Sequence, residues 1–254
     1  MTGRKGGINT TEIIGSIKNS ECNKTHLDIE RAEDRGIIHR DYLAHMLRWT
    51  HAIKHCKYKC KVLDVGCGNG MLAQVLYVNK FRPDYVGTDI RKSMIEDAEK
   101  RQLHESVRFY CSDITKTPLD VSDNTVDLMV CFEVMEHIPE YSADYVLREM
   151  ARCLKPDGVL LLSTPNYDGK HKAGNHIHEY WYDELAVLLK RFFTIENTYG
   201  TFASQKYIEP VLTEDERKVW SKLSEYYDSN MFSVLFAPLH AKQSRNILWQ
   251  LKKL

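Results

Sequence analysis

The sequence predicts an α/β fold in which helices flank an open, mostly parallel β-sheet. Short apolar runs typical of buried strands alternate with segments of helical periodicity through most of the chain. The first run lies in KVLDVGCGNG, residues 61–70, and ends in three glycines that a helical pattern follows at once. A strand, a glycine turn and a helix form the ligand-binding unit of open α/β sheets. The next two strands each end in an acidic residue, as the first does.

The first 57 residues are expected to form an N-terminal arm and a cap helix outside the sheet domain of residues 58–254. Residues 1–30 are polar and rich in Gly, Ser, Thr and Asn, a composition that favours an arm without its own core. Apolar residues then recur at helical spacing and predict an amphipathic helix that packs on the sheet or covers its ligand crevice. These residues are Ile38, Tyr42, Met46, Trp49 and Ile53.

The glycine turn helps to distinguish between two kinds of ligand. The dinucleotide fingerprint has its third glycine where Met71 stands, whereas this turn has it one residue earlier, at Gly70. Asp64, just before the turn, is unfavourable for a pyrophosphate and suits a ligand that carries an ammonium group. A turn that binds no ligand is the structural alternative.

Two further strands carry acidic residues at their ends. DYVGTDI places Asp89 about 20 residues after the turn, where a carboxylate can accept both hydroxyl groups of a ribose. Ile90 can then lie against an adenine ring. VRFYCSDI places Asp113 at the end of the third strand, next to the adenine amino group. Three acidic strand ends facing one crevice strengthen the case for a nucleoside-containing ligand such as S-adenosylmethionine (SAM).

The remaining elements continue the alternation of strands and helices. In order, we expect a helix from a capping box at 93–96 through 101, a strand at 126–132, a helix at 143–155 stopped by PDG, a strand at 159–163, a helix at 182–190 and a strand at 192–199.

The alternation breaks over residues 201–242. Residues 214–227 read as a charged helix, and NMFSVLFAPLH reads as an apolar, irregular segment before the last strand, SRNILWQL. Such an insertion is expected to form a lid or a wall for the substrate. A packing or dimer surface is the alternative.

Five motifs resemble, in order and spacing, those of class I SAM-dependent methyltransferases: KVLDVGCGNG, GTDI, CSDI, CFEVMEHIP and LKPDGVLLLSTPN. The resemblance covers residues 58–199 and implies a Rossmann-like, seven-stranded sheet with an antiparallel last strand. It also implies an enzyme that moves the methyl group of SAM to an oxygen or nitrogen of an acceptor. The expected cofactor-binding residues are Asp64, Gly66, Cys67, Gly68, Asp89, Ile90, Ser112, Asp113, Ile114, Phe132 and Glu133.

Candidate residues for a metal site lie in the later motifs. EVMEH supplies Glu133, Glu136 and His137, and NHIHEY supplies His176. The region from STPNY to NHIHEY resembles that of small-RNA 3′-terminal ribose 2′-O-methyltransferases, and ubiquinone-pathway O-methyltransferases resemble the EVMEH positions. The first resemblance implies that all four side chains hold Mg²⁺ or Mn²⁺, and two carboxylates with two imidazoles suit such an ion.

The same residues allow two readings without a metal. His176 can act as a catalytic base, with His137 and Glu136 beside it. Glu136 and His137 can also be a hydrogen-bonded cluster at a helix start, with no part in the chemistry. We favour the base, because the metal quartet rests on resemblance across one segment.

Composition limits the partners. Basic and acidic residues both number 35, so no cationic excess attracts nucleic acid. The leading prediction is therefore a small polar acceptor, such as a sugar or nucleotide, with an RNA or DNA methyltransferase as the alternative and an inactive SAM-binding partner subunit as a remote third. Seven cysteines without zinc-ligand spacing, no signal peptide and no long apolar span predict a reduced, cytoplasmic protein with no membrane partner.

Overall fold

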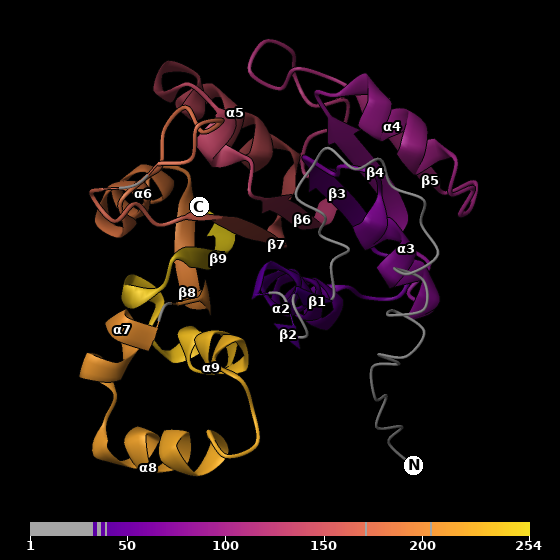
Figure 1. The fold of residues 1–254 in the computed structure, drawn as a ribbon. Helices are drawn as coiled ribbons and strands as arrows, with labels where there is room; N and C mark the ends of the chain where they lie inside the picture. The colour runs from indigo at the N-terminus through magenta and orange to yellow at the C-terminus, as the bar shows by residue number, and fades with distance from the viewer. Residues whose placement is uncertain (1–32, 35–36, 39, 171, 204) are drawn as a thin grey trace.

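The computed structural model describes residues 33–34, 37–38, 40–170, 172–203 and 205–254 (Figure 1). The N-terminal arm predicted over residues 1–30 lies outside the described residues. A short antiparallel pair, β1 (Glu33–Asp34) and β2 (Ile37–Ile38), precedes helix α2 (Arg40–His55). The apolar periodicity predicted a helix that includes Ile38, but Ile38 belongs to β2 and the helix starts at Arg40. Tyr42 and Trp49 of the predicted apolar face are buried in α2.

A seven-stranded mixed sheet forms the centre of the molecule (Figure 1). Its strand order is β5-β4-β3-β6-β7-β9-β8, with β9 antiparallel to both of its neighbours and the other pairs parallel. The predicted fold class is confirmed, including the antiparallel last strand. The strands are β3 (Lys61–Val65), β4 (Asp84–Asp89), β5 (Val107–Cys111), β6 (Val126–Phe132), β7 (Leu154–Pro165), β8 (Phe193–Phe202) and β9 (Asn246–Lys253).

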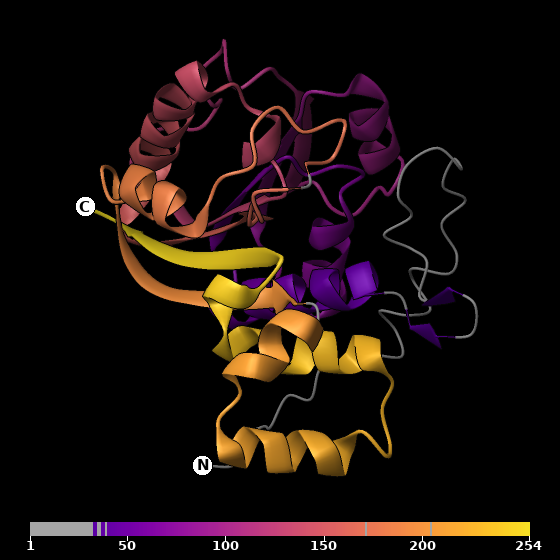
Figure 2. The same cartoon turned by 60° about the vertical axis from the view of Figure 1, so that its left-hand side comes forward.

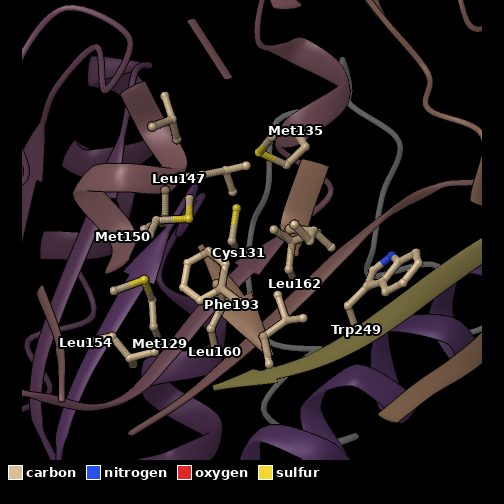
Figure 3. Close-up of a cluster of buried hydrophobic side chains, with 14 of the residues drawn as sticks. Met129, Cys131, Met135, Leu147, Met150, Leu154, Leu160, Leu162, Phe193 and Trp249 are labelled. Carbon is tan, nitrogen blue, oxygen red and sulfur yellow. The ribbon is translucent and has the colours of Figure 1, made fainter. Parts of the chain in front are cut away.

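Helices cover both faces of this sheet. In β6, Met129 and Cys131 belong to a buried cluster that includes Leu147 of α5, and Figure 3 shows these side chains together. Leu128 and Val130 point the other way, into a cluster with α2 and α3. Burial on both faces explains why the strands read as continuous apolar runs. These helices are α3 (Met71–Val78), α4 (Lys92–Glu99), α5 (Glu140–Cys153) and α6 (Tyr182–Leu189).

Several predicted helix boundaries are wrong, including the start of α5 at Glu140 and the end of α8 at Leu223, and two of the errors have a clear structural cause. Helix α4 begins at Lys92, so Ser93 lies inside the helix and forms no capping box; the Asp89 carboxylate instead accepts the backbone N–H of Arg91 at the entrance. The PDG sequence does not stop a helix, because α5 ends at Cys153 and PDG lies within β7.

The chain between β8 and β9 is helical, with α7 (Gln205–Ile208), α8 (Glu214–Leu223) and α9 (Ser229–Leu235). The apolar stretch predicted to be irregular forms α9 and a short 3-10 turn, because Phe232 and Phe236 pack on Trp220 of α8. Figures 1 and 2 show these helices grouped below the sheet. Since β9 begins at Asn246, opposite Pro165 at the end of β7, the insertion emerges at the carboxyl edge of the parallel strands. None of the described helices is long and apolar enough to cross a membrane.

Candidate active site

The glycine turn after β3 is joined to the end of β4. The backbone N–H groups of Gly66 and Cys67 both donate to the Thr88 carbonyl, at 2.8 and 2.9 Å. Gly66 has a φ of 78°, and a Cβ atom there would lie 2.2 Å from Cγ2 of Val134. Gly68 has a φ of 52°, but a Cβ atom there would meet nothing within 4 Å. The turn therefore packs tightly at Gly66 and presents an open backbone face at Gly68.

Replacing Gly66 with alanine is expected to cost about 1–3 kcal/mol of unfolding free energy, because the side chain meets both an unfavourable φ and a steric clash. Gly68→Ala is the matched control, since it carries the unfavourable φ without the clash. Urea denaturation followed by circular dichroism measures both. Equal losses for the two variants would contradict the tight packing at Gly66.

Asp89 connects the turn to β4. Its buried carboxylate accepts the Gly68 N–H at 3.1 Å through Oδ2, and the Arg91 N–H and Nε–H at 2.9 and 3.2 Å through Oδ1. A carboxylate oxygen has two lone pairs, so Oδ2 retains one acceptor position for a ribose hydroxyl. The open face at Gly68 and this carboxylate lie at one edge of the sheet, and their expected contact with SAM stays a prediction.

Asp64 is a buried carboxyl that accepts a hydrogen bond from the Tyr85 hydroxyl. Burial raises its pKa to about 7, and the nearby Asp89 charge adds to the rise, while the Tyr85 hydrogen bond opposes it. The side chain thus supports the turn from inside. Its expected contact with a ligand ammonium group stays a prediction.

The residues expected around the adenine differ in exposure. Ile90 is 65% exposed, an apolar side chain available to a flat ring. Asp113 is engaged locally: Oδ1 accepts from Thr115, and Oδ2 lies 2.7 Å from Lys116 Nζ, whose hydrogen bond lowers the Asp113 pKa. Ser112 is hydrogen-bonded to Thr117 at 2.6 Å. The contacts predicted for these residues with the cofactor stay predictions.

Three more predicted cofactor residues line the same region. Cys67 is buried in the turn, and burial raises its thiol pKa. Ile114 is partly buried against the cluster of α5 and α6, and Phe132 against that of α2 and α3. Each of the three residues ends a parallel strand or closely follows one. They therefore lie at the carboxyl edge of the sheet although they are far apart in sequence.

Glu133 joins three distant segments. Its Oε1 accepts from Ser163 Oγ at 2.8 Å, and its Oε2 accepts from Asn246 Nδ2 at 2.5 Å. Arg48 of α2 lies 3.7 Å away and is itself buried. The Glu133 backbone takes a φ of 55°. The Glu133 carboxylate therefore contacts the end of β7, the start of β9 and helix α2.

Glu136 and the loop before α6 are held together by the backbone. The Glu136 carbonyl accepts the N–H groups of Ile177 and His178 at 2.8 and 3.1 Å. The Glu136 side chain is 1% exposed and accepts from Thr164 Oγ1 at 3.1 Å. Burial, followed by repulsion from Glu133, raises its pKa well above the ordinary value. These bonds bring His176 beside a carboxyl group forty residues earlier in the chain.

Three of the four predicted metal ligands converge. One ligand atom from each of Glu136, His137 and His176 lies within 4.8 Å of the others, and the two imidazole rings meet edge to face with centroids 4.9 Å apart. Desolvation, with a smaller effect of His176, lowers the pKa of His137, which favours its neutral form. Glu133 does not belong to this group, because Ser163 and Asn246 hold its carboxylate.

His176 is oriented by Glu179, a candidate residue of the NHIHEY segment to which the sequence assigned no role. Glu179 Oε1 lies 2.6 Å from His176 Nδ1 and also accepts the Ala173 N–H. Because a carboxylate only accepts, this arrangement places the proton on Nδ1 and leaves Nε2 free to act as a base or ligand. Within the described part of the chain, the other oxygen of Glu179 is buried without a hydrogen-bond partner. The i, i+3 spacing within NHIHEY was the available signal.

His178 differs from His176 although it is two residues away. Its Nδ1 lies 3.3 Å from Glu140 and its Nε2 lies 2.8 Å from Glu184, so both ring nitrogens face carboxylates. This arrangement joins the starts of α5 and α6.

Comparisons with known proteins agree with this geometry. A family profile described as a methyltransferase domain matches residues 57–218. A ubiquinone biosynthesis O-methyltransferase of Pseudomonas putida is 27% identical over 190 residues, which cover 74% of each chain. Among solved structures, a TehB-like SAM-dependent methyltransferase of Corynebacterium glutamicum superposes with a TM-score of 0.55 at 18% identity, covering 82% of this chain and 87% of that one. The [4+2]-cyclase SpnF superposes with a TM-score of 0.61 at 18% identity, covering 96% and 92%. At these identities the structural likeness shows the fold.

Proposed function

We propose, from the premise that this chain belongs to the methyltransferase domain family and is a SAM-dependent methyltransferase, that its acceptor is a hydroxyl group of a small polar molecule. The observation that carries the proposal is the Glu179-oriented imidazole of His176 at the carboxyl edge of the sheet. A hydroxyl needs a base at that position, whereas a neutral amine does not. The O-methyltransferase named among the curated relatives points the same way.

The cofactor half of the crevice is assigned to the ends of β3, β4 and β5. Gly68 offers an open backbone face, Asp89 Oδ2 retains an acceptor position, and Ile90 exposes an apolar side chain. When bound, SAM supplies a methyl group already activated by its sulfonium. The protein then contributes mainly proximity and orientation, which suffice for much of the acceleration of a displacement reaction.

The acceptor half is assigned to His176 and its neighbours. His176 Nε2 takes the proton of the acceptor hydroxyl, and Glu179 keeps the imidazole in the required tautomer and stabilises the charge that forms. Glu136 and the neutral His137 line the same position. Methyl transfer from labelled SAM to a catechol, a nucleotide and a sugar, with an amine and an RNA oligonucleotide alongside, tests the proposal. Transfer to the amine alone would contradict it.

A second candidate is metal-assisted methylation of a terminal ribose in RNA. It is favoured by the convergence of Glu136, His137 and His176, a donor set that fits Mg²⁺ or Mn²⁺. A divalent ion there would polarise a vicinal diol and keep the buried Glu136 ionised. Glu133, the fourth residue of the expected quartet, is committed elsewhere. We therefore propose the base as the main role of His176.

Chelation separates the two candidates. If His176 acts as a base, EDTA is expected to leave the turnover of the methylated acceptor unchanged, because no step depends on an ion. The measurement compares product formation before EDTA, after EDTA and after addition of excess Mg²⁺ or Mn²⁺. Activity that disappears with EDTA and returns with either ion would favour the metal-assisted reaction.

We further propose that the insertion predicted over residues 201–242 forms a wall of the acceptor pocket. It emerges at the carboxyl edge of the sheet, because β9 begins opposite the end of β7. Asn246, its exit residue, already contacts Glu133, and Asn166 at the end of β7 donates to the Lys242 carbonyl at 3.1 Å. These contacts at the ends of β7 and β9 support a position of the insertion beside the proposed acceptor residues.

A further inference from the structure

We propose that Cys56 and Cys60 are a modification site, a dithiol that a hydroperoxide converts into a reversible disulfide. Cys56 directly follows α2 and Cys60 directly precedes β3. Both side chains are buried, with 5% and 7% exposed, and their Sγ atoms are 3.5 Å apart. Neither cysteine belongs to the cofactor or acceptor residues, so the proposal stands independently of the function proposed above.

The backbone holds the two thiols at this separation. Cys56 continues the helical hydrogen bonding through its N–H to the Ala52 carbonyl, at 2.9 Å. Cys60 donates its N–H to the Lys57 carbonyl across a tight turn, at 3.2 Å. A disulfide bond is about 2.0 Å long, so the two Sγ atoms must approach each other by roughly 1.5 Å for the bond to form. The turn between them carries exposed residues, including Tyr58 at 67% exposure, so the pair lies next to solvent-exposed chain.

The two thiols are chemically unequal. The hydrogen bond between the sulfur atoms lowers the pKa of Cys60, against the opposing effect of burial. The same contact raises the pKa of Cys56. Because the thiolate is the nucleophile, Cys60 is the thiol that reacts first.

The reaction balances with a hydroperoxide as the oxidant. The Cys60 thiolate attacks the terminal oxygen, forming an S–O bond while the O–O bond breaks and an alcohol or water leaves. The Cys56 sulfur then attacks the Cys60 sulfur, forming the S–S bond and releasing water. In total, two thiols and one hydroperoxide give one disulfide, one alcohol or water and one further water. Two sulfur atoms are oxidised and the peroxide is reduced.

The bond would tie together two elements that lead to the candidate active site. Helix α2 carries Arg48, which lies 3.7 Å from Glu133. Strand β3 runs from Cys60 directly into the glycine turn at Gly66. Oxidation therefore joins the end of the helix on the acceptor side to the start of the strand on the cofactor side.

The test uses the full chain with Cys22→Ser and Cys111→Ser, which remove a cysteine outside the described residues and the exposed one on β5. The folded protein is treated with hydrogen peroxide, denatured, alkylated and digested for mass spectrometry. We expect the peptide spanning Cys56 and Cys60 to lose the mass of two hydrogen atoms and to escape alkylation, and dithiothreitol to reverse both changes. In the same background, Cys56→Ser should instead leave a sulfenic acid on Cys60.

Two outcomes would overturn the proposal. Full alkylation of both cysteines after peroxide treatment would show that the pair does not close. A first oxidation at Cys153 or Cys131, which are also buried, would show that proximity does not direct the reaction. Because the main measurement needs no substitution at the pair itself, misfolding of the Cys56→Ser variant does not affect it.

Discussion

His176→Ala is expected to lower turnover by about 10²–10⁴-fold while the affinity for SAM stays unchanged. The substitution removes the imidazole whose Nε2 is proposed to take the acceptor proton, but it leaves the glycine turn and Asp89 intact. Steady-state kinetics with a hydroxyl acceptor measure the first quantity. Calorimetric titration with SAM measures the second.

His178→Ala is the matched control for this experiment. His178 lies in the same loop and is partly exposed, but both of its ring nitrogens face the carboxylates of Glu140 and Glu184. We expect a loss of stability with little loss of turnover. If His176→Ala turns over like the unmodified protein, neither the base nor the metal-ligand reading survives.

Glu179→Gln extends the same test to a positioning residue. The amide retains the shape of the side chain but can present an N–H to Nδ1, which favours the opposite imidazole tautomer. Turnover should fall while the KM for the acceptor changes little, because Nε2 then presents its lone pair to the acceptor hydroxyl less often. A purely structural Glu179 would lower stability without lowering the turnover of the folded enzyme.

Asp89→Ala is expected to weaken SAM binding by about 1–3 kcal/mol, equivalent to about 5- to 150-fold in dissociation constant. The variant loses the acceptor for the ribose hydroxyls and also the bond that joins Gly68 to the end of β4. Calorimetry with SAM and with S-adenosylhomocysteine provides the measurement.

Asp84→Ala serves as its control, because Asp84 begins the same strand at the opposite edge of the sheet. Its partner, Lys61 at 3.9 Å, is a surface contact of small energy. SAM affinity should therefore be unchanged in that variant. Unchanged affinity in Asp89→Ala as well would remove Asp89 from the cofactor site, and binding of NAD without SAM would overturn the assignment of the cofactor.

Features that depend on near neighbours could be predicted from the sequence. The strand periodicity, the turn at Gly66 and Gly68 and the acidic ends such as Asp89 all arise within a few residues, where backbone geometry limits the choices. The order of βα units then restricts the sheet topology, so the fold class followed. Helix boundaries were less predictable. Ser93 has the pattern of a capping residue, but the Asp89 carboxylate accepts the backbone N–H of Arg91 just before α4 begins.

The composition of the acceptor side depends on contacts between distant residues. His176 meets Glu136 because two backbone hydrogen bonds hold its loop against that carbonyl. Glu133 and Glu136 are both glutamates of the EVMEH motif, yet the Glu133 carboxylate is hydrogen-bonded by Ser163 and Asn246 instead of joining the histidines. Periodicity and motif spacing carry no information on such pairings, because they are decided by which strand ends and loops share one edge of the folded sheet. The contact between Glu179 and His176 also depends on the folded loop, in which the buried Glu179 carboxylate lies against the His176 ring.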